Sequence, residues 1–134
     1  MNISFAPNFY VLNVADAIAF YKKAFNAAEL RRFSNDDGSV HVAEMMIGDA
    51  MFHIHEETQR HNKLSPATLN GTTVEVGVFI KDVDGMFHQA LSAGASEVSP
   101  PQDYEYGYRQ ASIKDLFGHH WTFQKKINVS SDTH

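Results

Sequence analysis

Two histidines in one apolar stretch have types and spacing that fit chemistry at a site. His53 and His55 lie two residues apart in AMFHIHE, residues 50–56. Successive side chains of a strand point to opposite faces, so Phe52 and Ile54 would face a core and both histidines would share the other face. An imidazole can bind a metal, carry a proton or simply form a hydrogen bond. His53 is therefore a candidate functional residue, with a purely structural hydrogen bond as the alternative, and His55 is a candidate ligand-binding residue beside it.

Glu75 is the best candidate for a catalytic side chain. It lies in TVEVGVFI, residues 73–80, where the valines alternate on one face and Glu75 shares the other face with Gly77 and Phe79. Apolar surroundings disfavour an ionised carboxylate, and such desolvation could make Glu75 a usable general base at neutral pH. The alternative is a carboxylate neutralised by Arg109 or by a histidine as a structural pair.

The stretch YGYRQASIKDLFGHHWTFQ predicts a hairpin of two strands, residues 108–114 and 119–124, around a tight Asp-Leu-Phe-Gly turn. Polar and apolar side chains alternate along the second strand. One face carries His120, Thr122 and Gln124, and the other carries Trp121 and Phe123. The apolar face is suited to packing under helices, so the polar face could line a site, with His120 and Thr122 as candidate ligand-binding residues. His119, next to the turn, is interpreted as structural.

Three tyrosines and an arginine near this hairpin complete the candidates. Tyr104, Tyr106 and Tyr108 are amphipathic and could form a lid over an aromatic ligand, or could instead cover exposed core. Arg109 could pair with a ligand carboxylate or phosphate through its planar guanidinium group. Its alternative role is to hold the tyrosine loop in place.

The composition is that of a folded acidic protein of 134 residues, with 43% hydrophobic and 20% charged residues. A net charge of −5 disfavours nucleic acid and anionic membranes as partners. The absence of cysteine excludes disulfides, thiolate metal ligands and a cysteine nucleophile. No apolar run has membrane-spanning length and the start lacks a signal-peptide pattern, so a cytoplasmic location is expected. Phosphate-binding glycine loops and the G-x-S-x-G elbow are also absent from the sequence.

The elements that must position these candidates are predicted to occur twice in the same order. The first half reads as a strand, a helix and three strands, at residues 3–14, 16–25, 29–34, 40–47 and 50–56. The second half repeats this at residues 73–80, 83–93, 96–99, 108–114 and 119–124. Similar segments, such as NAAEL and GASEV, recur about 70 residues apart. One sheet with one helix cannot bury both sheet faces, so we expect two such modules around a shared hollow.

The chain is accordingly expected to form one domain of two modules, at about residues 3–56 and 72–127. Residues 57–71 are polar and aperiodic, which predicts a linker or mobile loop. Two consecutive prolines at residues 100–101 predict the end of the strand at 96–99. Residues 128–134 are predicted to be frayed.

Four segments taken together resemble a known superfamily. They are AIAFYKKAF, VHVAEMMIGDAMFHIHEE, FIKDVDGMFHQALSAGA and PPQDYEYGYRQASIKDLFGHHW. In order and spacing they are similar to the vicinal-oxygen-chelate superfamily, which includes glyoxalase I, bleomycin-resistance proteins and extradiol dioxygenases, and within it to the PhnB-like branch. The resemblance covers residues 5–126 and implies an α+β fold of tandem βαβββ modules, forming cupped antiparallel sheets around a cavity with helices outside. The chain departs from the branch pattern at three positions. Tyr108 replaces an acidic residue, Leu116 replaces a proline and Asn26 replaces a glycine.

Metal-dependent members of this superfamily carry one His, Glu or Gln ligand on the first and fourth strands of each module. The corresponding positions here are Ala6 to Asn8, His53, Glu75 and Thr122. Only His53 and Glu75 are good ligands, because Asn8 would coordinate poorly and Thr122 stands where a carboxylate is expected. The resemblance therefore implies either a reduced metal centre or a polar cavity wall that binds an organic ligand without metal.

A third metal ligand could come from His55 or His120 only if either side chain shifted its position. Three functional hypotheses therefore stay open. The first is a small-molecule-binding protein without a complete metal centre and with an unidentified ligand. The second is a metal-dependent lyase, isomerase or dioxygenase that uses His53 and Glu75 with a divalent cofactor such as Zn, Ni, Fe or Mn. The third is a metal-free enzyme with Glu75 as general base on a small carbonyl compound. The resemblance also implies that the chain forms a homodimer and that it binds a small organic molecule.

Overall fold

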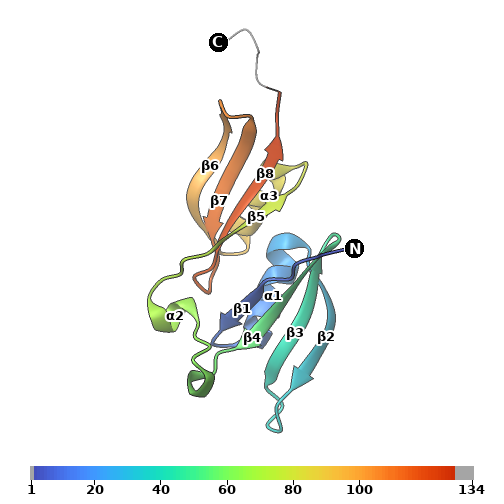
Figure 1. The fold of residues 1–134 in the computed structure, drawn as a ribbon, viewed down its shortest axis with the longest axis vertical. Helices are drawn as coiled ribbons and strands as arrows, with labels where there is room; N and C mark the ends of the chain where they lie inside the picture. Colours follow the sequence, from blue (N-terminus) through green and yellow to red (C-terminus); the bar gives the residue numbers. More distant parts are fainter. Residues whose placement is uncertain (1, 129–134) are drawn as a thin grey trace.

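Two βαβββ modules follow one another along residues 2–128, the part of the chain that the structure, a computed structural model, describes (Figure 1). The first contains β1 (Asn8–Val11), α1 (Val14–Phe25), β2 (Ala28–Ser34), β3 (Val40–Ile47) and β4 (Ala50–Glu56). The second contains β5 (Glu75–Phe79), α3 (Val83–Ser92), β6 (Ser96–Tyr104), β7 (Tyr108–Lys114) and β8 (His120–Lys126). Between the modules lie the 3-10 helix η1 (Gln59–His61) and the short helix α2 (Pro66–Leu69).

Each module forms a four-stranded sheet with the same topology. The strand orders are β1-β4-β3-β2 and β5-β8-β7-β6, so equivalent strands occupy equivalent places. The first strand of each module runs parallel to the last, and the other pairs are antiparallel. A helix between the first two strands returns the chain so that they run in the same direction, and two hairpin reversals then leave the fourth strand parallel to the first. The predicted α+β fold is confirmed, with mixed sheets in place of purely antiparallel ones.

Helix α1 shows how the local sequence defines an element. The side-chain Oδ1 of Asn13 accepts a hydrogen bond from the backbone N–H of Asp16 at 3.0 Å and so caps the start. Asn26 ends the helix in the left-handed conformation, with a φ of 55°. The helix therefore begins at Val14, two residues before its predicted start. None of the helices within residues 2–128 is both long and apolar enough to span a membrane.

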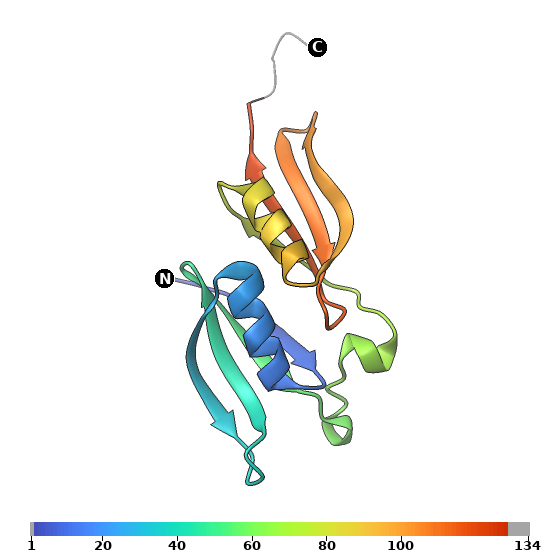
Figure 2. The same ribbon diagram turned by 180° about the vertical axis from the view of Figure 1, so that it is seen from behind.

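The two modules share one aromatic core. Trp121 of β8 lies with its ring centroid 4.9 Å from that of Phe9 and 4.7 Å from that of Phe25, which belong to the first module. Figure 2 shows α1 and α3 on the same side of the molecule, each covering one sheet. Since both helices bury apolar faces against their sheets, the core lies on this side of both modules.

The segment between the modules is more ordered than its composition predicts. The carboxylate of Glu57 accepts hydrogen bonds from the backbone N–H of Ser65 at 2.8 Å and from the Thr68 hydroxyl at 2.9 Å. These bonds secure the first turn of α2, where Pro66 packs against Gly118 of the second module. The sequence predicts a linker or mobile loop here. Within this segment, capping bonds and a tertiary contact form η1 and α2 without hydrophobic periodicity.

Strand β6 also departs from the prediction, because the two prolines do not end it. The strand runs from Ser96 to Tyr104, with a register irregularity between Ser99 and Gln102 at the prolines. An edge strand needs hydrogen bonds on one side only, so it tolerates residues that lack a backbone N–H. The predicted frayed tail falls almost wholly on residues 129–134, which lie outside the described residues.

Candidate ligand-binding site

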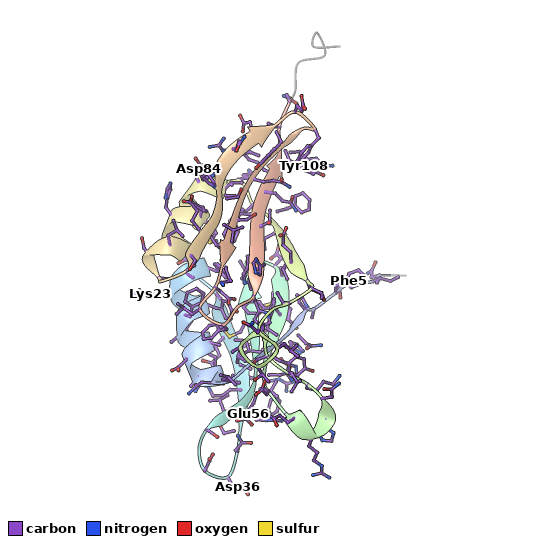
Figure 3. The ribbon with its side chains drawn as sticks, turned by 90° about the vertical axis from the view of Figure 1, so that its left-hand side faces the viewer. Phe5, Lys23, Asp36, Glu56, Asp84 and Tyr108 are labelled. Atoms are coloured by element: carbon purple, nitrogen blue, oxygen red, sulfur yellow. The ribbon has the colours of Figure 1, made fainter. Side chains whose placement is uncertain are left out.

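Each sheet has one face that the long helices leave open. In Figure 3, Asp84 and Lys23 lie on the helix side of the molecule, whereas Tyr108 and Phe5 lie on the other side. The open faces carry the side chains that alternate with buried ones along the strands. From β4 these are Met51, His53 and His55. From β8 they are His120, Thr122 and Gln124, of which Thr122 is itself buried. The polar face of each strand is thus the face away from the core, as the alternation predicts.

On the first sheet, His53 lies in the middle of a cross-strand row. Its register partners are Asn8 on β1 and Glu44 on β3. The guanidinium group of Arg31 donates two hydrogen bonds of 3.0 Å to the Glu44 carboxylate, and this lowers the pKa of Glu44. Nε2 of His53 lies 3.4 Å from Sδ of Met51. His53 is therefore held by side chains of its own sheet and presents its ring to the open face.

His55 is the next residue along the same face. Its Nε2 lies 3.0 Å from Oδ1 of Asn8, and its ring stacks on Tyr10 at 5.1 Å between centroids. Partial burial lowers the pKa of His55, and the nearby His53 and His41 lower it further. The imidazole is therefore neutral at neutral pH and can act as a hydrogen-bonding group of the site.

On the second sheet, hydroxyl groups lead to Glu75. The Thr122 hydroxyl donates to Oε1 of Glu75 at 2.7 Å, and Oγ of Ser112 lies 2.7 Å from the Thr122 hydroxyl oxygen. An ionised carboxylate only accepts, so Thr122 must donate to it and Ser112 must in turn donate to Thr122. Glu75 itself is exposed in the single chain. The desolvation that the sequence suggests for this carboxylate therefore requires something else to cover the open face.

Aromatic side chains line the other end of the same face. The rings of Tyr104 and Tyr106 stack with their centroids 5.2 Å apart. The ring of Tyr108 packs edge to face against Tyr106 and against Phe79, with centroid distances of 6.0 Å and 6.1 Å. Phe79 is 64% exposed, although it is a large apolar residue. The tyrosines predicted to form a lid thus make a continuous aromatic surface. Phe79 is an additional member that its position two residues beyond Gly77, on the face of Glu75, could have indicated.

Two glutamines connect the aromatic and acidic ends of this face. The Tyr106 hydroxyl donates to Oε1 of Gln110, and Nε2 of Gln110 donates to Oε1 of Gln124 at 2.8 Å. Gln110 and Gln124 are direct register partners on β7 and β8. The sequence places Gln124 on the polar face, but only the strand pairing brings Gln110 beside it.

Arg109 and His119 make structural contacts away from the open faces. The guanidinium group of Arg109 donates two hydrogen bonds of 2.8 Å to Asp84 of α3 and one of 2.9 Å to Asp103 of β6. These bonds lower the pKa of Asp84 and occupy the planar group on the helix side. Nε2 of His119 lies 3.0 Å from the carbonyl oxygen of Tyr10 and so joins the two modules. The structural interpretation accounts for the position of both residues.

The residues of the chain do not complete the metal centre that the superfamily pattern implies. Within residues 2–128 of one chain, no three His, Asp or Glu side chains come together to hold an ion. His53 lies on the first sheet and Glu75 on the second. The Thr122 hydroxyl is neutral and already bonded to Glu75 and Ser112. Of the four superfamily positions, His53 and Glu75 alone carry good metal ligands, and the neutral Thr122 hydroxyl is a poor ligand for a divalent cation.

Two clefts flank the second sheet. The larger, of about 780 Å³, lies between the two modules, with β5 on one side and the start of β4 on the other, and includes Gly77, Phe79 and Met51 among its walls. The smaller, of about 330 Å³, lies between α2 and the turn before β8 and reaches His120 and Lys114. Of the candidate site residues predicted from the sequence, all of them within residues 2–128, His120 alone lines either cleft.

This combination of paired βαβββ modules and open polar faces defines a class of protein, and comparison with known sequences identifies it. The sequence profile of the glyoxalase/bleomycin resistance protein/dioxygenase superfamily matches residues 6–123. An uncharacterized protein of Mycobacterium tuberculosis is 34% identical over 125 residues, which cover 91% of this chain and 74% of that protein. The chain therefore belongs to the glyoxalase/bleomycin resistance protein/dioxygenase superfamily.

Solved structures share the same fold. TioX from Micromonospora sp. ML1 is 27% identical, with a TM-score of 0.74 over 93% of this chain and all of TioX. A gene product of Arabidopsis thaliana is 26% identical, with a TM-score of 0.70 over 92% of this chain and 98% of its own. The fosfomycin resistance protein FosX of Mesorhizobium loti has a TM-score of 0.67 at 16% identity, over 93% of this chain and 92% of FosX. This last likeness shows the fold alone.

Proposed function

We propose that this protein binds a small organic molecule between two copies of the chain, without a complete metal centre. The observation that carries the proposal is that both open faces lie on the same side of one chain (Figure 1). They therefore cannot cover each other, although each presents polar or aromatic side chains suited to a ligand. In the dimer that we propose, the first sheet of one protomer opposes the second sheet of its partner and encloses the ligand on two sides. His53 of one protomer would then face Glu75 of the other.

Exposed apolar side chains support the association of two copies. Phe5 is 90% exposed, and Val74 and Phe79 are each 64% exposed. These residues lie beside β1 and β5, which are edge strands with one unpaired side. Large apolar side chains and free strand edges in one region are typical of an interaction surface. A homodimer would cover them and would remove Glu75 from water at the same time.

The chemistry of the open faces supports an organic ligand with an aromatic part. The surface formed by Phe79 and Tyr104, Tyr106 and Tyr108 offers stacking contacts, and the amides and hydroxyls beside it offer hydrogen bonds. The ligand-binding set would comprise His53, His55, Tyr106, Tyr108, His120 and Thr122, together with Glu75. A place in the PhnB-like branch and a cytoplasmic location belong to the same proposal and rest on the sequence patterns alone.

A second candidate function is metal-free catalysis with Glu75 as general base. The observation that favours it is the fixed carboxylate, which Thr122 holds through Oε1 while Oε2 has no hydrogen-bond partner among residues 2–128. A base must reach the proton that it removes, and Oε2 of Glu75 is not occupied by another described side chain. A Glu75→Gln variant should bind the same molecules but lose turnover, and unchanged turnover would exclude this role.

The proposed function is tested on untagged purified protein by three measurements. We expect a dimer by size-exclusion chromatography with light scattering, substoichiometric metal by elemental analysis, and a raised melting temperature with small aromatic or carbonyl compounds. A ligand at 100 times its Kd stabilises the folded state by about 2.7 kcal/mol, which a thermal shift detects. One bound metal per chain that is lost in His53→Ala would instead support the metal-dependent hypothesis. A monomer that binds such ligands with full affinity would contradict the dimeric site.

A further inference from the structure

We infer that the ligand presents an N–H group next to a carbonyl on the edge of a planar aromatic system, as in a lactam, an imide or an aromatic amide. The inference rests on the proposed function and specifies the ligand class for the same site. Its basis is the open face around Gly77, where one acceptor atom of Glu75 and one donor atom of Gln124 have no hydrogen-bond partner among residues 2–128.

Gly77 leaves room for the side-chain amide of Gln124 because it lacks a side chain of its own. It lies in the middle of β5, between Val76 and Val78, and is the register partner of Thr122 on β8. A Cβ atom at this position would lie 2.6 Å from Nε2 of Gln124, closer than side chains tolerate. The Gln124 amide therefore occupies space that any other residue at position 77 would take.

The acceptor on this part of the open face is Glu75 and the donor is Gln124. Oε1 of Glu75 is bonded to Thr122, and Oε1 of Gln124 accepts from Gln110. The remaining atoms, Oε2 of Glu75 and Nε2 of Gln124, have no hydrogen-bond partner among residues 2–128. Both groups lie beside the same register pair. The Glu75 carboxylate accepts from Thr122, and the Gln124 amide lies over Gly77, which pairs with Thr122.

An acceptor beside a donor selects for the complementary pair on a ligand. The ligand N–H would donate to Glu75, and the adjacent carbonyl would accept from Nε2 of Gln124. The aromatic ring would then extend toward Phe79, which is the register partner of Gln124, and toward Tyr108. An anionic ligand group would be repelled by Glu75, and a hydrocarbon would leave both polar atoms unpaired on burial. The geometry thus favours a neutral N–H and carbonyl edge.

The test compares two probes that differ by one methyl group, isoquinolin-1(2H)-one and its N-methyl derivative. Both have the same ring and carbonyl, but only the first has an N–H. Isothermal titration of each probe into the wild-type protein should show at least about tenfold tighter binding of the unmethylated lactam. Equal affinities would overturn the inference and would leave the proposed function standing, because an aromatic ligand would still bind.

Two variants separate the acceptor from the donor. Glu75→Met removes the acceptor, so the preference for the N–H probe should fall to within about twofold. Gln124→Met removes the donor to the shared carbonyl, so both affinities should fall by a similar factor of about ten while their ratio is kept. Glu97→Met is the matched control, because Glu97 is an exposed acid of β6 whose register partner is the buried Ile113. It should change neither affinity.

The remaining outcomes also decide the inference. A preference that survives in Glu75→Met would overturn it. Failure of both probes to bind wild-type dimer at about 1 mM would overturn it as well, because a complementary site should bind more tightly than that. The proposed function would fall separately, if a broad set of aromatic and carbonyl compounds also gave no thermal shift. Thermal unfolding of each variant checks its folding, and the comparison of probes on the wild-type protein does not depend on any variant.

Discussion

The open faces of the two modules differ far more than their scaffolds do. Asn8 pairs with His53 in the first sheet as Gly77 pairs with Thr122 in the second, so the strand registers correspond. Around these positions the first sheet has histidines, a methionine and an Arg–Glu pair, and the second has a carboxylate, hydroxyls, amides and tyrosines. The inward positions of both modules are apolar because they must bury a core, whereas the outward positions are free to take different roles. Two dissimilar faces on one repeated scaffold are suited to a cavity whose opposite walls make different contacts with a ligand.

The closing turns of the two modules differ in a second way. Asp115, before the turn of the second module, is only 4% exposed. Four groups donate to its carboxylate: the Tyr21 hydroxyl, the Trp121 indole and the backbone N–H groups of Phe117 and His119. Burial raises the pKa of Tyr21 and the Asp115 carboxylate raises it further, so the phenol stays a donor. The second turn thus fastens the modules together, while Asp49 in the first turn is exposed.

The largest expected effect is therefore on stability at Asp115. Asp115→Ala should lower the free energy of unfolding by about 3–5 kcal/mol, because it leaves buried donors of both modules without an acceptor. Urea unfolding followed by circular dichroism measures this loss. Asp49→Ala is the matched control in the first turn and should stay within about 0.5 kcal/mol of wild type. Similar losses at both positions would mean that the second turn has no special part in joining the modules.

The next prediction concerns binding and depends on which faces oppose each other. His53→Ala and Glu75→Ala homodimers should each bind an aromatic ligand at least about tenfold more weakly, since each site loses one wall contact. Mixed dimers, made by co-expression with two different tags, should regain half of the wild-type binding capacity at wild-type affinity. This follows because one of their sites carries both changes and the other carries none. Mixed dimers without any restored site would instead place both residues in a site within one chain.

A smaller effect should distinguish the equivalent glycines of the two turns. Gly48 and Gly118 both have a positive φ, at 53° and 91°, so alanine is strained at either position. A Cβ atom at Gly118 would also lie 2.7 Å from Cβ of Pro66, whereas at Gly48 it would meet no described atom within 4 Å. Gly48→Ala should cost about 1 kcal/mol and Gly118→Ala about 1–3 kcal/mol more, as measured by chemical denaturation. Equal costs would show that α2 does not press on the second turn.

The smallest expected effect is on the pH dependence of stability at His55. Its pKa in the folded protein is lower than in the unfolded chain, so the unfolded chain binds a proton first as the pH falls below about 6.5. Stability should therefore be unaffected by this group above that pH and should decrease below it. His55→Gln should flatten the decrease between about pH 6.5 and 5 by well under 1 kcal/mol, because the ring is only partly buried. Thermal melts across this range measure the change, and an unaltered slope would contradict it. His61→Gln, in the exposed η1 segment, is the control.

The faces on which the candidate residues lie could be predicted because short-range alternation sets them. The period of two along AMFHIHE and HHWTFQ is enough to place His53 and Thr122 away from the core. Glu75 follows from the same rule. The identity of the contacts on those faces could not be predicted. Arg109 binds Asp84 and Asp103 on the helix side, which no spacing in the sequence distinguishes from a place in the site.

The amino-acid sequence by itself determined the order of strands and helices, the repeat, and which side of each strand faces the core. These features depend on periodicity and capping within a few residues, as at Asn13 and Asn26. Tertiary structure alone decided how distant residues meet. Tyr21 reaches Asp115 across 94 residues of sequence, Gln124 lies over Gly77, and both open faces are left on one side of the molecule. Such contacts depend on how sheets and helices pack around a shared core, and the polar side chains that make them have no local pattern to reveal their partners.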